Sequence, residues 1–182
     1  MAITTGELLW KFSVKTGAAG NSTTGTAAGS LGKYISTTQV TDATLNNLFD
    51  DVTGDENAAS TVVDYRCIFI HNSNASLAWT SPVVWMSAET ANGVDCAIAT
   101  DNVAASAIGS ASAQAAEIAT ETTTPTGVSA FSSPTTKGTG LSLGASIAAG
   151  SCKAIWIRRT SANRAALDSD SVTVRAEGDT AA

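Results

Sequence analysis

The stretch VVDYRCIFI, Val62 to Ile70, is the most strand-like part of this chain. β-Branched and aromatic residues dominate it, and these residue types favour extended backbone. It ends at HNSN, and SLAWTSPVVWMS, Ser76 to Ser87, follows with a similar composition. The polar residues Asn72 to Ala75 between the two runs predict a turn that joins two antiparallel strand partners.

Regular alternation of side chains predicts further strands. Between Glu7 and Lys15, large apolar residues occupy every second position, which places them on one face of a strand. In KAIWIRR, Lys153 to Arg159, Trp156 stands between two isoleucines, and this predicts a central strand that is buried on both faces. Shorter strands are expected at Tyr34–Ile35, Val94–Ala99 and Ser171–Ala176.

One short amphipathic helix is expected between the second and third predicted strands. Thr41 or Asp42 can cap its N-terminus, and apolar residues recur at three- and four-residue spacing from Leu45 to Val52. Gly54 is expected to end this helix.

Three segments lack the large apolar residues that would define a buried face. Thr16 to Lys33 holds five glycines among small polar residues and is expected to be a flexible, exposed arm or loop. Val103 to Thr120 is rich in alanine, but its larger residues are too sparse for a helical stripe, so loop and strand are favoured. Residues 178–182 are expected to form a polar tail.

Taken together, these patterns predict an all-β fold. Seven to nine strands, Gly/Pro-rich turns and no alternation of strands with helices are typical of an antiparallel β-sandwich or jelly-roll-like domain. We expect a single domain over residues 1–182, with one short helix and the N-terminal arm or loop.

Composition argues against several classes of partner. The net charge is −6, only 14% of residues are charged, and Arg158–Arg159 is the one adjacent basic pair, so we expect no binding to nucleic acid. No run approaches the roughly 20 apolar residues that cross a bilayer, and we expect no membrane association. The N-terminal residues do not resemble a secretory signal, so the chain is expected to stay where it is made.

The residues that usually carry catalysis or bind metals are scarce. Cys67, Cys96 and Cys152 are an odd number at wide spacing within predicted strands, which indicates buried free thiols rather than disulfides or a metal site. His71 is the single histidine, and its place beside Asn72 predicts a surface turn residue with no catalytic role. We therefore expect no enzyme activity, no catalytic residues, no cofactor and no metal.

Other motifs have structural explanations that we favour. The acidic groups Asp50–Glu56 and Asp168–Asp170 lack the spacing of a calcium loop and are expected to be solvated. Gly140 and Gly144 are expected in turns. The acceptor patterns at Asn21 and Asn74 are expected by chance in a chain rich in Ser and Thr.

The tryptophans could serve either packing or binding. All four lie in predicted strands, so we favour packing in the core over stacking platforms for sugars or bases. They are Trp10, Trp79, Trp85 and Trp156.

Two segments carry a resemblance to a known group of proteins. They are DYRCIFIHNSNASLAWTSPVVWMS, Asp64 to Ser87, and Gly140 to Thr180, which includes GLSLG, AIWIRRT and VRAEGDT. In these motifs the chain resembles small β-rich virion structural proteins of tailed bacteriophages, similar to head decoration or cement proteins. The resemblance implies a non-enzymatic virion protein that is assembled in the host cytoplasm, binds the major capsid protein and forms homo-oligomers.

Two alternatives remain at this point. A tail, neck or baseplate component would have the same general character. A carbohydrate- or receptor-binding β-sandwich would give the tryptophans a binding role. The resemblance favours a capsid decoration protein that stabilises the head, with the glycine-rich arm reaching across neighbouring capsid subunits.

Overall fold

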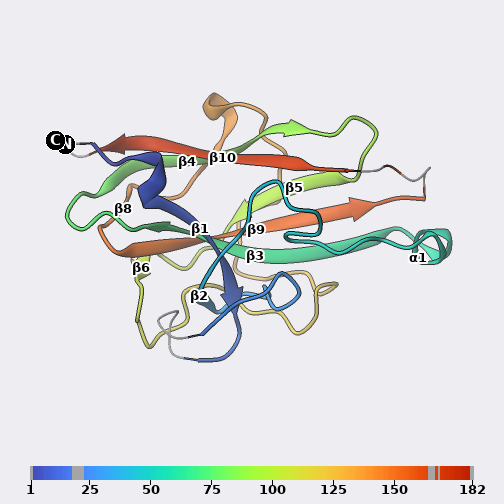
Figure 1. The fold of residues 1–182 in the computed structure, drawn as a ribbon, viewed down its shortest axis with the longest axis horizontal. Helices are drawn as coiled ribbons and strands as arrows, with labels where there is room; N and C mark the ends of the chain where they lie inside the picture. The colour runs from blue at the N-terminus through green and yellow to red at the C-terminus, as the bar shows by residue number, and fades with distance from the viewer. Residues whose placement is uncertain (1, 18–22, 164–166, 168, 181–182) are drawn as a thin grey trace.

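The computed structural model describes residues 2–17, 23–163, 167 and 169–180, and it has an all-β architecture of two antiparallel sheets. Figure 1 shows the two sheets stacked, with a further layer of loops beneath the larger sheet. The strands in the described residues are β1 (Leu8–Val14), β2 (Tyr34–Gln39), β3 (Val62–Asn72), β4 (Trp79–Glu89), β5 (Asp95–Thr100), β6 (Ser106–Ala107), β7 (Leu141–Ser142), β8 (Ser146–Ile147), β9 (Ser151–Ser161) and β10 (Val172–Thr180). The helices are α1 (Gly54–Ala59) and the 3₁₀ turns η1 (Thr5–Glu7) and η2 (Lys137–Thr139).

The six-stranded sheet forms the middle layer. Its order is β2-β1-β3-β9-β5, with β6 paired to β9. The four-stranded sheet has the order β10-β4-β7, with β8 also paired to β4. The predicted antiparallel sandwich is therefore confirmed, and no helix in the described residues is long and apolar enough to cross a membrane.

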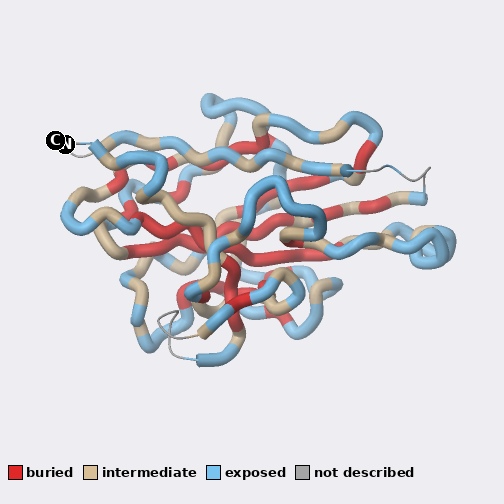
Figure 2. The backbone as a smooth tube through the Cα atoms, viewed as in Figure 1, coloured by how far each residue is buried: buried red, intermediate tan, exposed pale blue. Residues whose placement is uncertain are grey.

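The six-stranded sheet is buried on both faces, as Figure 2 shows by its red central strands. We call the apolar cluster between the two sheets the inner core and the cluster on the opposite face of the six-stranded sheet the outer core. Along β9, Ile155 and Ile157 pack into the inner core, and Trp156 packs into the outer core without any exposed surface. The prediction of a central strand buried on both faces is confirmed.

A loop layer, residues 23–33 and 101–131, covers the outer core. β1 pairs with β3 only from Ile68 to Asn72, so the rest of this edge of β3 needs other partners. The Cys67 N–H donates to the carbonyl of Ser30 at 2.8 Å, and the Tyr65 N–H donates to the carbonyl of Glu121 at 2.8 Å. The loops thus complete the hydrogen bonding of a central strand.

This arrangement corrects the expectation of an exposed arm at Thr16–Lys33. Residues 18–22 lie outside the described residues, but Gly25, Ser30 and Gly32 are buried. Gly32 is held by its N–H, which donates to the Ser13 hydroxyl at 2.9 Å. The segment was misjudged because small residues without an apolar face can still pack through their backbone.

The predicted helix lies in the wrong place. Residues 41–53 form turns, in which Ala43 and Asn46 have positive φ values of 53° and 55°, incompatible with a helix. The helix begins instead at Gly54, where Thr53 caps it by accepting from the Glu56 N–H in a capping box. Leu45 is 75% exposed, so the apolar spacing did not define a buried stripe.

Two further expectations need correction. Asn72–Ala75 does not join paired strands, because β3 belongs to the six-stranded sheet and β4 to the four-stranded sheet. The buried Asn72 amide donates to the carbonyls of Leu77 and Ile147, which shapes a connection that crosses between the sheets. At the C-terminus, residues 178–180 continue β10 rather than forming a tail, and residues 181–182 lie outside the described part.

Candidate functional site

Two buried arginines meet at one end of the inner core and form ion pairs with Asp50, Asp64 and Glu121. Arg66 on β3 is 2% exposed and Arg159 on β9 is 7% exposed. Asp64 lies directly opposite Arg159 across the β3–β9 pair. Because buried charges are costly unless they are paired, the partners of these arginines decide what the cluster can do.

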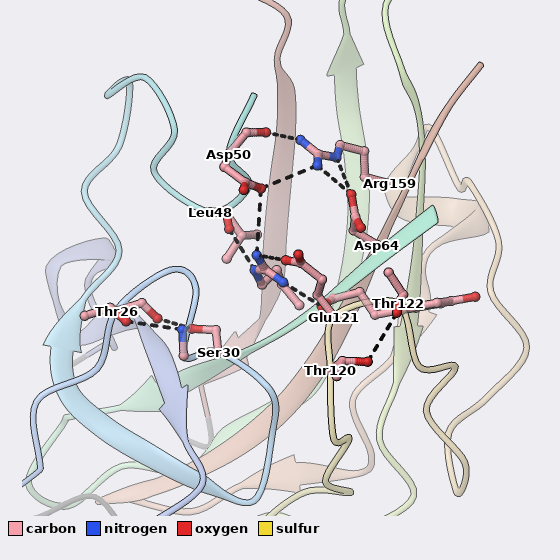
Figure 3. Close-up of polar contacts among 12 residues, drawn as sticks. Thr26, Ser30, Leu48, Asp50, Asp64, Thr120, Glu121, Thr122 and Arg159 are labelled. Carbon is pink, nitrogen blue, oxygen red and sulfur yellow. Dashed lines mark hydrogen bonds and ion pairs between the residues drawn. The ribbon is translucent and has the colours of Figure 1, made fainter. Parts of the chain in front are cut away.

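Each guanidinium is engaged by the protein itself (Figure 3). Arg159 donates from Nε and Nη2 to Asp64 Oδ2, and from Nη1 to the carbonyl of Asp50. Arg66 donates from Nε to the carbonyl of Leu48 at 3.2 Å and forms an ion pair with Glu121. Most donors of both arginines are therefore used internally.

The cluster fastens the turn segment 41–53 to the sheet. Its Phe49 ring lies 5.5 Å from Cζ of Arg66 and 4.8 Å from Cζ of Arg159, within cation–π range of both. Asp50 adds a carboxylate Oδ1 at 3.6 Å from Arg159 Nη2, although its side chain is 71% exposed. We call Arg66, Arg159 and their partners the clamp, because together they hold the turn segment 41–53 against β3 and β9.

An open groove of about 510 Å³ lies beside this clamp. Its carboxylates already have internal partners, because Asp64 and Glu121 are bound to arginines and Glu56 accepts from the Thr53 N–H at 2.8 Å. The cap hydrogen bonds also lower the pKa of Glu56. The groove is lined by Glu56, Ala59, Ser60, Thr61, Val62, Val63, Asp64, Glu121 and Thr122.

Asp50, Asp51, Asp55 and Glu56 are exposed, as expected, but Asp55 and Glu56 lie in the first turn of α1 rather than in a loop. Among the described residues, no group of three or more His, Cys, Asp or Glu side chains could hold a metal ion. Of the second acidic group, Asp168 lies outside the described residues, and Asp170 accepts from the Val94 N–H at 2.7 Å.

A second polar centre joins the loop layer to β9. The carboxylate of Asp101, which is 2% exposed, accepts from Trp156 Nε1 at 2.9 Å and from the Ala116 N–H at 2.8 Å through Oδ2, and from the Val103 N–H at 2.9 Å through Oδ1. Lys153 Nζ donates to the carbonyls of Asp101, at 2.6 Å, and Val103. Burial lowers the pKa of Lys153. These groups order the loop that follows β5.

Gln114 supplies a third internal connection. Its side chain is buried, and its Oε1 accepts from the Ile35 N–H at 3.2 Å. Its Nε2 lies within hydrogen-bond distance of Ser106 Oγ, the Ala107 carbonyl and Cys152 Sγ. Gln114 thereby links β2, β6 and β9 across the outer core.

The structure places His71 differently from the sequence prediction. It is 5% exposed within β3 rather than in a surface turn, opposite Leu9 of β1 and Cys152 of β9. Neither ring nitrogen has a hydrogen-bond partner among the described residues. Burial, reinforced by the charge of Lys11, lowers the pKa of His71 to about 4. Within the described part of the chain, no carboxylate orients this ring as a general base would require.

The three cysteines are buried in β3, β5 and β9, as predicted. Burial raises the pKa of Cys67 well above its ordinary value, and raises those of Cys96 and Cys152 to about 12. Their thiols therefore stay protonated at neutral pH and are poor nucleophiles.

The remaining predicted features occupy structural positions. Trp79 and Trp156 are buried in the two cores and Trp10 is half-buried against the inner core, so the packing interpretation is confirmed for these three. Trp85 is also buried, but it alternates with the inner-core residues Val84 and Met86 and so lies on the other face of β4. Gly140 and Gly144 flank β7. Of the two acceptor asparagines, Asn21 lies outside the described residues.

The other acceptor, Asn74, uses its side chain inside the protein. Its Oδ1 accepts from the Ser76 and Leu77 N–H groups, and its Nδ2 donates to Glu7 Oε1 at 2.7 Å. These bonds fix the crossing from β3 to β4.

Neither the clamp nor the Asp101 centre was predicted from the sequence. One signal was present: alternation in VVDYRCIFI puts Asp64 and Arg66 on the same face as Ile68 and Ile70. Charged residues at core-facing positions indicate buried ion pairs. Nothing in the local sequence pointed to Glu121 as a partner.

Comparisons with known proteins do not assign the chain to a family. No protein-family model matches it, and no match was found among the curated proteins or among the solved structures.

Proposed function

We propose that this protein is a non-enzymatic structural component of a tailed-bacteriophage virion, and specifically a capsid decoration protein. In this role it binds the major capsid protein on the outside of the head and stabilises the lattice by non-covalent contacts. Assembly takes place in the host cytoplasm.

The observation that carries the proposal is where the resemblance-bearing segments lie in the fold. Asp64–Ser87 contributes most of β3 and β4, and Gly140–Thr180 contributes β7 to β10. These strands build the centre of both sheets. The resemblance to virion proteins therefore involves the framework of the domain and not a peripheral loop.

The physical character of the domain supports this role. A protein that bridges capsid subunits needs to keep its shape under load. Here the six-stranded sheet is covered on both faces, and the Arg66–Arg159 clamp and the Asp101 centre fasten its loops. A surface with few charges suits repeated contacts within a lattice.

One alternative loses its original motivation. A carbohydrate-binding role was suggested by the tryptophans, but Trp10, Trp79 and Trp156 pack against a core, and Trp85 is only 8% exposed. A tail, neck or baseplate protein could use the same rigid sandwich, so the experiment below compares binding to heads with binding to tails.

The test is co-sedimentation of the purified protein with phage heads that lack it. We expect saturable binding to heads and no binding to isolated tails, and cryo-EM of the loaded heads should show one added density at repeated lattice positions. An unrelated acidic β-sandwich of similar size controls for trapping in the pellet. Binding to tails alone would favour the tail alternative, and binding to neither particle would contradict the virion proposal.

A further inference from the structure

β10 forms an open edge of the four-stranded sheet. Its nine residues, Val172–Thr180, pair only with β4 in the described structure. Burial alternates along it between half-buried and exposed residues. In Figure 1, β10 runs across the upper part of the molecule beside β4. An unpaired strand of this length is a ready template for another strand.

The backbone of β10 presents hydrogen-bonding groups at this edge. The Met86 N–H donates to the Pro134 carbonyl at 2.8 Å, on the side of β4 that faces away from β10. In an antiparallel pair of strands, a residue whose N–H and C=O point away from the neighbouring strand belongs to a non-hydrogen-bonded pair, and so does the residue opposite it. Met86 lies opposite Val174, so the N–H and C=O groups of Val174 point to the open edge.

The same orientation applies two residues further along the strand. Val84 pairs with β7 on the far side of β4 and lies opposite Ala176. The carbonyls of Thr173 and Asp179 accept from β4 side chains, which shows that the odd-numbered residues face β4. Among the described residues, no group outside β4 bonds to the backbone of Ala176.

The charges on the exposed face of β10 are self-complementary. Suppose that β10 pairs antiparallel with β10 of a second copy about a two-fold axis at Ala176. Arg175 then lies opposite Glu177 of the second copy, and Glu177 lies opposite its Arg175. An axis at Arg175 or at Glu177 would instead place two like charges opposite each other, which is destabilising.

Arg175 is available for such a contact. No ion pair engages it within the described residues, whereas Glu177 is bound by Lys137 of η2. In the paired arrangement, Glu177 lies between Lys137 of its own chain and Arg175 of the second copy. One carboxylate between two cations is electrostatically favourable.

We infer that two copies of this chain associate edge to edge through β10, about a two-fold axis at Ala176. The pairing joins the two four-stranded sheets into one continuous sheet. Val174 and Ala176 of both copies then lie on the same face, which continues the inner core across the junction. The inference is independent of the proposed virion role.

Charge reversal tests the register. R175E and E177R should each raise the dimer dissociation constant about tenfold or more, because two attractive pairs become two repulsive pairs. An equimolar mixture of the two variants should associate again, since every cross-strand pair is then complementary. The double variant R175E/E177R should dimerise like the wild type. Sedimentation velocity over a range of protein concentrations measures each case.

Two further variants separate the interface from other effects. K137A removes the internal partner of Glu177 and should change the dissociation constant less than E177R does. A176P removes an N–H that points outward, a position where an edge strand tolerates proline, and it should abolish association. Circular dichroism checks that each variant stays folded. If A176P does not fold, the charge variants alone test the β10 interface.

Three results would overturn the inference. The wild type could remain monomeric up to about 1 mM, where even very weak association is detectable. R175E and E177R could associate as tightly as the wild type, alone as well as mixed. The assembly could contain an odd number of subunits, which a two-fold pairing of this edge does not produce.

Discussion

Replacing Trp156 by alanine tests whether the loop layer and the six-stranded sheet enclose a true second core. Trp156 has no exposed surface, and its indole N–H donates to Asp101 at 2.9 Å. The backbone of Gly32 lies so close that a methyl group placed there would be 3.0 Å from Cζ2 of the indole. The ring is thus enclosed by the strand on one side and by loop backbone on the other.

The expected loss of stability has two parts. Removal of a fully buried tryptophan side chain costs about 3 to 5 kcal/mol, including the cavity it leaves. Trp156→Phe keeps most of the packing but leaves Asp101 with one donor fewer, and should cost about 1 to 3 kcal/mol. Small domains have a free energy of unfolding of about 5 to 15 kcal/mol, so both variants should remain folded or lie close to the point where folded and unfolded protein are equally populated.

Urea unfolding followed by circular dichroism measures these losses without relying on tryptophan fluorescence. Leu45→Ala, at a side chain that is 75% exposed, serves as the control and should change the free energy of unfolding by less than about 0.5 kcal/mol. A loss below about 1 kcal/mol for Trp156→Ala would show that the loop layer does not pack on the sheet, and the reasoning about the outer core would be wrong.

Three other perturbations probe separate features, each by equilibrium unfolding. Asp64→Ala should cost about 3 to 5 kcal/mol by leaving the buried Arg159 without its main partner, whereas replacing the pair by Asp64→Leu with Arg159→Met should cost much less. Burial lowers the pKa of His71 to about 4, so between pH 6.5 and 4 the unfolded chain takes up a proton that the folded protein does not. The free energy of unfolding should therefore fall by up to about 3 kcal/mol as the pH drops through this range, and His71→Leu should not show this loss. Gly32→Ala should lower the free energy of unfolding by at least about 2 kcal/mol, because the φ of Gly32 is +94° and the added methyl would lie 1.9 Å from a backbone oxygen. Gly138→Ala, where the added methyl meets open space, should be nearly neutral. Equal effects of the two substitutions would contradict this packing.

The strands were predictable because their signal is local. Alternation between Lys153 and Arg159 determines which side chains share a face, whatever the strand pairs with, and β9 is indeed buried on both sides. Pairing partners are not a local property. The short connection at Asn72–Ala75 suggested a hairpin, but the Asn72 amide bonds to the distant Ile147 carbonyl and directs the chain into the other sheet.

The clamp was only half visible in the sequence. Asp64 and Arg66 stood at core-facing positions of a predicted strand, which signals buried ionic groups. The carboxylate partners of Arg66 come from other segments: the region around Asp50 was expected to be helical, and Glu121 follows the alanine-rich segment Val103–Thr120 and had no predicted structure. A buried ion pair needs tertiary structure to bring its members together, so composition and periodicity could not identify it.

The loop layer shows why the small-residue composition was misleading. A layer made of side chains needs large apolar residues, but a layer made of backbone needs residues that allow close approach. A methyl group at Gly25 would lie 2.8 Å from Cβ of Phe12 on β1, and the corresponding group at Gly32 would strike the carbonyl of Ala116. The Gly, Ala, Ser and Thr residues that suggested a free arm are therefore the residues that let these loops lie directly on the sheet and on each other. Backbone hydrogen bonds to β3 fix these loops in place, together with a few apolar side chains such as Leu31 and Ile118 that pack into the outer core.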